Sequence, residues 1–288
     1  ESKVIGNKLI FKGESQLQML YRSSAGGLCT AEYELPFSQI MEITGAGEES
    51  TCDVYVVLTG LDCALDSGDG RTISVSMGLL AQAVVREERT LQMLTDVYST
   101  AFQLTAESRT YTLGRLVEHG EKELTVREIL ETGMLAQEVS DAYVTIGAIT
   151  QSRDGRRVTL TAEANVTVLY LTEDGARTSI TRQLQAACPL ELPEEASCSC
   201  HCGCTAPVFA TPTTGGIEVR FPVGFRYTAM TSRTTAAVSA VHMDEGTPRD
   251  HSGQPSIVLR MVGNGERLWD IAKSYGTTAQ DIMCAKIG

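Results

Sequence analysis

Apolar and polar residues alternate along most of the chain, which is the pattern of β-strands that bury one face. The segments between these runs contain Gly-Gly and Asp-Gly pairs, in "SSAGG", "DSGDG", "SRDGR" and "TEDGA". Because Gly and Asp tolerate positive φ, such pairs predict tight hairpin turns and therefore antiparallel sheets. The alternating runs occupy residues 9–21, 52–65, 72–85, 157–172, 216–230 and 234–243.

The chain also resembles itself at a long period. "GESQLQMLYRSSAGG" aligns with "AEANVTVLYLTEDGA", and "GRTISVSMGLLAQAVV" aligns with "GGIEVRFPVGFRYTAM". This repeat predicts a mainly β protein with two tandem antiparallel β domains, at 1–110 and 143–245. The connecting segment between them, 111–142, is expected to carry a short helix or an edge strand.

Composition changes after residue 245. "GTPRDHSGQPS" is rich in Gly, Pro and polar residues, so 246–256 is expected to be a linker. Residues 257–288 predict a strand, a Gly-rich turn and an amphipathic helix that ends at Gly276, followed by a second helix capped by Thr277 or Thr278. We therefore expect a small, truncated α/β module. The chain lacks an initial Met and ends inside this motif, so we expect a fragment of a longer protein.

Charge excludes one class of partner. The net charge is −12 and no basic cluster offsets it, so the chain is not expected to bind nucleic acid. No apolar run is long enough to span a bilayer, so a transmembrane protein is not expected either.

Motifs for catalysis are not found. The sequence has no P-loop, dinucleotide fingerprint or nucleophile elbow, and its four histidines form no closely spaced pair. We therefore expect no enzymatic activity, no cofactor and no metal site.

The densest chemical motif is "CSCHCGC", with Cys198, Cys200, Cys202 and Cys204 around His201. On an extended strand the four thiols share one face, spaced about 6–7 Å apart, and the histidine points the other way. Zinc needs its ligands about 2.3 Å from one centre, so a straight strand cannot bring four thiols to one ion.

Two alternatives to a metal site are open for these cysteines. They align with the apolar face of "STCDVYVVL" in the first repeat, which favours reduced thiols that line a strand. Disulfides are the other alternative, because nine cysteines are present, with Cys188, Cys63, Cys29 or another chain as partners. The question is whether this face looks into its own domain or toward another chain. The thiol or disulfide candidates are Cys188, Cys198, Cys200, Cys202 and Cys204.

The C-terminal sequence "GERLWDIAKSYGTTAQDI" resembles a LysM module through its Leu-Trp, Ile-Ala and Tyr-Gly pairs. Glu266 and Arg267 stand where that family usually has Asp and Thr. The resemblance implies binding of N-acetylglucosamine-containing glycan or of a protein partner. The residues it implicates are Gly265, Glu266, Arg267, Leu268, Thr277 and Thr278.

The two β repeats resemble the SPOCS repeat of sporulation proteins through "GESQLQMLYR", "ELPFSQIMEI" and "LQMLTDVYS", and through "ANVTVLYLTEDG" and "GIEVRFPVGFRY". SPOCS repeats with one LysM are similar to SipL-type spore coat morphogenesis proteins. This resemblance implies a non-enzymatic protein that recruits coat proteins to the forespore surface, with a morphogenetic ATPase or other coat proteins as partners. The implied location is the mother-cell cytoplasm at the forespore surface and then the spore coat.

Two other functions are weighed against this one. Tandem β domains with exposed edges can self-associate, so a disulfide-linked extracellular or spore-surface fibre is the main alternative. A LysM-targeted cell-wall hydrolase is the third, and the lack of catalytic motifs argues against it.

Overall fold

The protein is mainly β, as expected. In the computed structural model, strands hold 67% of the residues and helices 5%. The long strand pairs are antiparallel hairpins. The structure describes residues 1–47, 49–66, 68, 70–250, 252–253, 255 and 257–285.

The chain divides into two compact units, and each consists of two stretches of sequence. One unit contains Glu1–Arg89 with Leu116–Thr231, and the other contains Thr90–Arg115 with Ser232–Gly288. We call Glu1–Arg89 the first lobe and Leu116–Thr231 the second lobe. These borders differ from the predicted domains 1–110 and 143–245, because pairing between distant strands decides them. The predicted linker 246–256 and module 257–288 each include residues outside those described.

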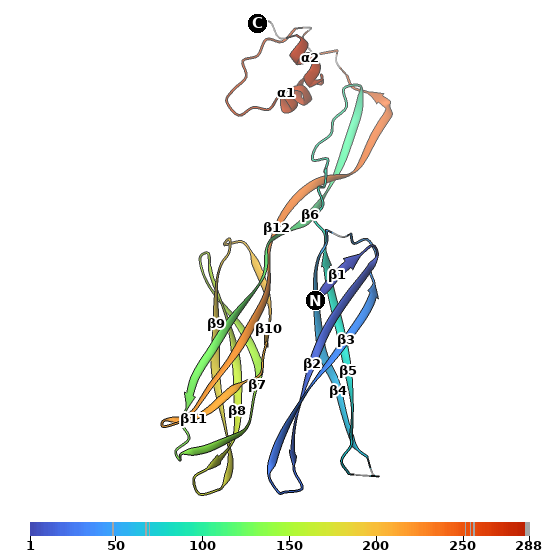
Figure 1. Cartoon of the computed structure of the whole chain (residues 1–288). Helices are drawn as coiled ribbons and strands as arrows, with labels where there is room; N and C mark the ends of the chain where they lie inside the picture. The colour runs from blue at the N-terminus through green and yellow to red at the C-terminus, as the bar shows by residue number, and fades with distance from the viewer. Residues whose placement is uncertain are drawn as a thin grey trace. The chain divides into compact units, whose positions relative to one another are not determined.

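The first lobe contains two separate sheets, one with three strands and one with two. In Figure 1 its strands run from blue to cyan. The three-stranded sheet has the order β1-β2-β3, and β4 and β5 form the second sheet as a hairpin. Its strands are β1 (Ser2–Ile5), β2 (Lys8–Arg22), β3 (Leu28–Glu42), β4 (Thr51–Leu65) and β5 (Ile73–Arg86).

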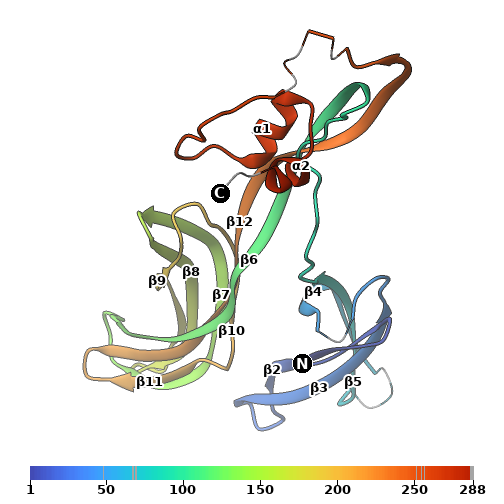
Figure 2. The same ribbon diagram turned by 90° about the horizontal axis from the view of Figure 1, so that it is seen from above.

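The second lobe contains two larger sheets, with the orders β7-β8-β9 and β10-β12-β11, and β6 also pairs with β12. Seen from above, these strands curve around a common interior (Figure 2). Of residues 111–142, predicted as a connecting segment, 111–130 belong to β6 and 136–142 to β7. The strands are β6 (Phe102–Leu130), β7 (Ala136–Asp154), β8 (Arg157–Thr172), β9 (Arg177–Glu191), β10 (Ser197–Cys204), β11 (Phe209–Thr213) and β12 (Gly216–Pro248).

The hairpins β2–β3 and β8–β9 have the same register. The first pairs Lys8 with Glu42 at its open end, and the second pairs Arg157 with Glu191. Both turns close with the same two backbone hydrogen bonds. Each turn has a glycine at positive φ, at Gly26 (88°) and Gly175 (78°), where a side chain would be strained.

The second lobe holds the main core. Alternate residues of β8 from Val158 to Thr172 are buried, and so are alternate residues of β12 from Ile217 to Ala229. This is the period-two pattern expected of two sheets that face each other. Each buried Val, Ile or Phe side chain stabilises the fold by roughly 1.5–3 kcal/mol.

The first lobe is less enclosed. Its buried apolar residues are Val4, Leu9 and Phe11, and the rest of β2 is only half-buried on its inner face. The Phe37 ring of β3 covers Gly13 of β2 so closely that a Cβ built on this glycine would lie 2.3 Å from Cζ. The equivalent pair in the other hairpin is Ala162 and Ala186, so Phe37 occupies space that a larger residue at position 13 would need.

The C-terminal module is helical. Helix α1 (Leu268–Tyr275) ends at Gly276, which has φ 65°, and α2 (Ala279–Cys284) begins with a capping box between Thr278 and Asp281. Both helices were predicted. The predicted strand at 257–262 is not formed: it pairs with no strand among the described residues, and Met261 is 95% exposed. Among the described residues, no helix is long and apolar enough to cross a membrane.

The Gly13–Phe37 contact predicts a specific effect of mutation. Gly13→Ala should destabilise the first lobe by about 1–3 kcal/mol, because the added methyl group displaces the Phe37 ring. Gly60→Ala in β4 is the matched control, since a Cβ there meets nothing within 4 Å. Urea unfolding of both variants measures the difference. Equal midpoints for the two variants would show that Phe37 moves aside without cost.

Candidate functional site

The cysteine row of β10 faces the core of the second lobe. Cys198, Cys200 and Cys202 lie opposite Ala229, Tyr227 and Phe225 of β12, all of which are buried. The four cysteines of the row are half-buried and pack against the core, and Cys188 of β9 lies fully inside it. All nine cysteines are free thiols in the structure. The face therefore looks into the core of its own lobe.

Partial burial also disfavours the thiolate form of these side chains. It raises the pKa of Cys200 from 9.0 to about 12, with a smaller contribution from the neighbouring thiols. It likewise raises the pKa of Cys202 to about 11. Because the thiolate is both the nucleophile and the metal ligand, these groups favour neither role near neutral pH. Within the described residues, no group of three His, Cys, Asp or Glu side chains is arranged to hold a metal ion.

The opposite face of β10 contacts the first lobe. His201 stacks on Tyr55 of β4, with ring centroids 3.7 Å apart. Nearby, Arg226 Nη1 of β12 donates to the Val54 carbonyl at 3.3 Å. One face of the cysteine strand thus lines a core, and the other face joins the two lobes.

A buried carboxylate lies at the same junction. Asp53 of β4 is 2% exposed, and it accepts a hydrogen bond from Arg86 Nη1 of β5 at 2.7 Å. His119 of β6 places Nε2 3.3 Å from the other Asp53 oxygen, and its Nδ1 lies 3.3 Å from Thr228 Oγ1. A carboxylate removed from water needs such partners, so this network couples β4 and β5 to β6 and β12.

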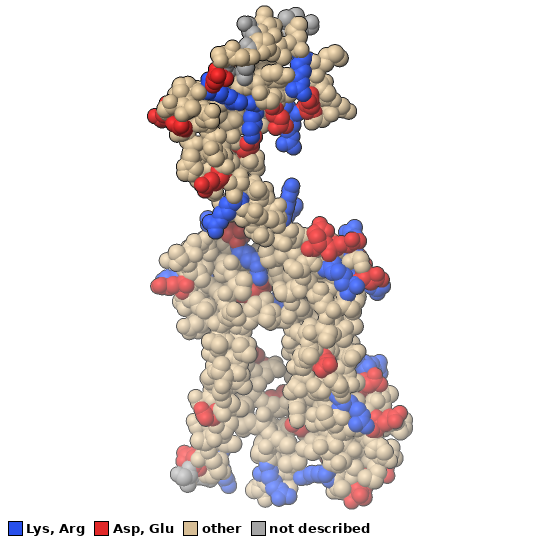
Figure 3. All heavy atoms as spheres, turned by 180° about the vertical axis from the view of Figure 1, so that it is seen from behind, with Lys and Arg blue, Asp and Glu red and all other residues tan. Residues whose placement is uncertain are grey.

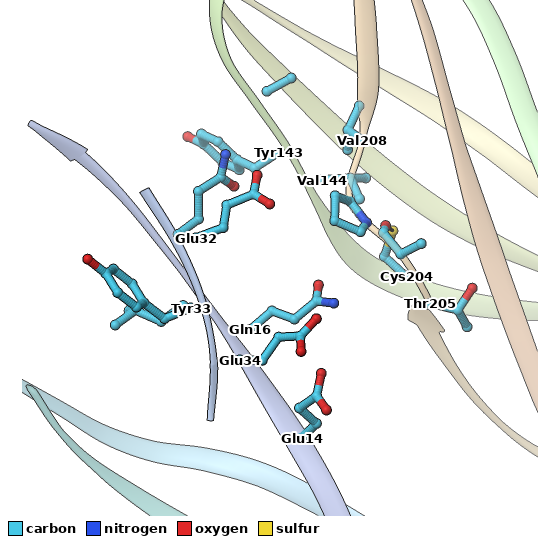
Figure 4. A pocket seen from close by; sticks show the side chains of 15 residues that line it. Glu14, Gln16, Glu32, Tyr33, Glu34, Tyr143, Val144, Cys204, Thr205 and Val208 are labelled. Atoms are coloured by element: carbon cyan, nitrogen blue, oxygen red, sulfur yellow. Dashed lines mark hydrogen bonds between the residues drawn. The ribbon is translucent and has the colours of Figure 1, made fainter. Parts of the chain in front are cut away.

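An open cleft of about 940 Å³ lies between the β2–β3 hairpin and the second lobe. Figure 4 shows Glu14, Gln16 and Glu34 pointing across it toward Thr205, whereas Tyr33 points away. The facing wall is formed by β7 and by residues 204–208. Gln18 Nε2 crosses between the walls and donates to Asp141 Oδ1 at 2.7 Å. This polar, acidic cleft suits contact with cationic or hydrogen-bonding groups.

The LysM-like residues are placed at the two ends of α1. Gly265 (φ 88°), Glu266 and Arg267 precede the helix, and the Glu266 carboxylate accepts from the Gly263 N–H at 2.8 Å. Leu268 is the first residue of α1. Thr277 and Thr278 follow the helix, where Thr278 caps α2 through Asp281. A helix of eight residues is about 12 Å long, so α1 separates the two groups.

Asp96 anchors the exposed face of α1. Its carboxylate accepts from Trp269 Nε1 at 2.8 Å and pairs with Lys273 Nζ at 2.7 Å. These two bonds lower the pKa of Asp96. The Trp269 ring also meets Tyr98 edge-on, with centroids 4.8 Å apart. Trp269 is therefore a packing and hydrogen-bonding residue here.

Neither carboxylate network was predicted from the sequence. The sequence does contain a hint of the Asp53 network, because Asp53 is a charged residue inside the alternating run "TCDVYVV". Its partners Arg86 and His119 come from strands that pair with different neighbours, so no local pattern connects them. Asp96 lies in an irregular segment and gave no signal at all.

The buried pair predicts a strong effect of removing its cation. Arg86→Met keeps most of the aliphatic stem and leaves the Asp53 carboxylate buried without its ion pair, which should cost about 3–5 kcal/mol of unfolding free energy. Arg89→Met removes an exposed ion pair with Glu87 and is the control. Chemical denaturation should show a large shift for the first variant and none for the second. Similar midpoints would mean that Asp53 is stabilised without Arg86.

The thiol row predicts a loss of stability in alkali. Because folding raises the pKa of Cys200 and Cys202, the folded state keeps protons that the unfolded state releases above pH 9. The stability of the protein should therefore fall as pH rises from about 9 to 12. The double variant Cys200→Val with Cys202→Val should flatten this fall, and Cys63→Val, at an exposed position, should not. Thermal unfolding at several pH values, with reductant, makes the comparison; identical slopes in all three proteins would contradict the buried thiol row.

One comparison with known proteins found a similarity, which is confined to the first lobe. A family model described as "SipL, SPOCS domain" matches residues 1–66, which contain β1 to β4. Neither the comparison with curated proteins nor the one with solved structures found a match. The match supports a sporulation-related, coat-associated role. Residues 1–66 are thus similar to the SPOCS domain of SipL.

Proposed function

We propose that the chain is a non-enzymatic structural or adaptor protein of the bacterial spore envelope. It helps to recruit or assemble coat proteins at the forespore surface, where a morphogenetic ATPase or other coat proteins are its partners. The observation that carries this proposal is the SPOCS-domain match at residues 1–66.

The surfaces of the lobes support contact with proteins. The hairpin β4–β5 exposes large apolar side chains, including Val57 (56%), Leu65 (62%) and Leu80 (59%). Figure 3 shows broad areas without charged side chains, with acidic and basic groups interspersed around them. Exposed apolar surface of this kind is typical of interaction sites.

We assign a docking role to the helical C-terminal module. Its candidate contact residues are those at the two ends of α1, from Gly265 to Leu268 and at Thr277 and Thr278. Trp269 is excluded from this set because its indole is engaged by Asp96 and Tyr98. The ligand is a glycan that contains N-acetylglucosamine or a protein partner.

A disulfide-linked fibre is less well supported. Its main argument was the cysteine row, and these thiols face the core of the second lobe. Cys63 and Cys284 are the exposed cysteines, and they belong to other elements. We therefore propose the adaptor role in preference to the fibre.

Localisation tests the proposal directly. The chain fused to a fluorescent protein and produced in the mother cell of a sporulating bacterium should concentrate around the forespore and then remain with the coat. The fluorescent protein alone, made from the same promoter, is the control. Recruitment should precede the arrival of labelled coat proteins if the chain assembles them.

Two results would contradict the proposal. A diffuse signal throughout sporulation would remove the coat-associated role. Clearing of peptidoglycan by the purified chain on a zymogram would instead support the hydrolase alternative.

A further inference from the structure

The two equivalent hairpins differ in what covers their outer edge. In the second lobe, β7 pairs with β8 from Asp154↔Arg157 to Ala136↔Thr172, so both edges of β8 are occupied along its length. In the first lobe, β1 pairs with β2 only from Ile5↔Lys8 to Ser2↔Phe11. Glu1 adds two backbone hydrogen bonds to Lys12. Beyond Lys12, no strand among those described pairs with this edge of β2.

Burial differs in the same way at equivalent positions. Tyr21 at the end of β2 is 45% exposed, whereas its counterpart Tyr170 is 5% exposed. Leu17 and Met19 are half-buried, whereas Val166 and Val168 in the same places of β8 are fully buried. The first lobe therefore has the inner apolar face of a closed sandwich but lacks the strand that closes it.

The open edge carries backbone groups that can pair. Lys12 directs its N–H and its carbonyl toward Glu1 on this side, at 2.9 and 3.0 Å. Since successive residues of a strand direct these groups to opposite sides, Glu14, Gln16 and Gln18 present theirs on the same edge. Their side chains point away from the plane of the sheet and line the open cleft over its outer face.

We propose that the first lobe accepts an antiparallel β-strand from a separate polypeptide, which pairs with Gly13–Arg22 of β2 as β7 pairs with β8. Strand addition of this type is a common way to bind an extended peptide. It also protects an edge that would otherwise be an aggregation hazard. The inference deepens the proposed adaptor function, because it names the surface and the binding mode.

The chemistry of the partner strand follows from β7 and from the charges on the acceptor. In β7, Ala142, Val144 and Ile146 face the buried side chains of β8, so the added strand needs aliphatic residues at alternate positions. Its other face meets the side chains around Gln16 and Gln18. The carboxylates of Glu14, Glu32 and Glu34 lie on this face, so Lys or Arg at the outward positions is favoured.

A synthetic peptide tests the acceptor edge. The probe is the sequence of residues 142–150 with Tyr143→Lys and Thr145→Lys, which keeps the aliphatic face and makes the outward face basic. A scrambled peptide of the same composition is the control. Fluorescence anisotropy should show saturable binding of the probe to the full chain, and hydrogen exchange should slow at Gly13–Arg22. Equal binding of the two peptides would overturn the proposal.

A proline in β2 separates strand addition from other contacts. Gln16→Pro removes an N–H on the open edge and leaves the β2–β3 pairing intact, because that pairing uses the neighbouring residues. It should weaken binding of the probe by at least about tenfold, whereas Gln16→Thr should change it by less than about twofold. If Gln16→Pro fails to fold, a probe peptide with alternate backbone nitrogens methylated provides the same test. This peptide lacks the N–H groups that would donate to the carbonyls of β2. Unchanged affinity in either form would contradict pairing at this edge.

The oligomeric state of the purified chain, measured without any peptide, is a further test of the proposal. If the chain forms dimers in which Gly13–Arg22 is already protected from exchange, a second copy occupies the edge and the proposed partner is wrong. These binding results are independent of localisation in sporulating cells. A chain that reaches the forespore but does not bind the probe would refute strand addition and leave the adaptor role in place.

Discussion

The alternation of side chains along a strand is the constraint on which the rest of this structure depends. A strand directs every second residue to one face, so a core between two sheets closes only if both sheets present apolar residues in register. β8 meets this requirement from Val158 to Thr172 and β12 from Ile217 to Ala229, and β7 and β6 occupy their remaining edges. The second lobe consequently has a continuous apolar core, and its half-buried thiol row packs against it.

The first lobe obeys the same alternation with fewer strands. Its β2–β3 hairpin has the register of β8–β9, yet no described strand continues the pairing of β2 beyond Lys12. The difference in exposure between Tyr21 and Tyr170 follows from this missing neighbour and not from a difference in residue type. An open edge and an apolar inner face are what a protein that binds extended segments would present. This geometry is therefore compatible with the adaptor role that we propose.

Polar interactions connect strands of the first lobe to strands of the second lobe. Asp53 is buried with Arg86 and His119, and the stack of His201 on Tyr55 lies beside it. A buried ion pair stabilises less than its Coulomb energy suggests, but its loss is costly and its geometry is specific. This network links strands of the two lobes at one place. Asp96 performs a similar role for α1, through Trp269 and Lys273.

Local elements could be predicted from the sequence, because turns and alternation are local properties. The predictable features were the strand class, the hairpin turns at Gly26 and Gly175, both C-terminal helices and the shared face of Cys198 to Cys204. Long-range packing was needed to show that this face points inward, that 111–130 and 136–142 belong to long paired strands, and that 257–262 is unpaired. It also decided which partners surround Asp53 and which edge of β2 stays open. Each of these depends on which strands pair across long stretches of chain, and alternation along one strand contains no information about the strand that will lie beside it.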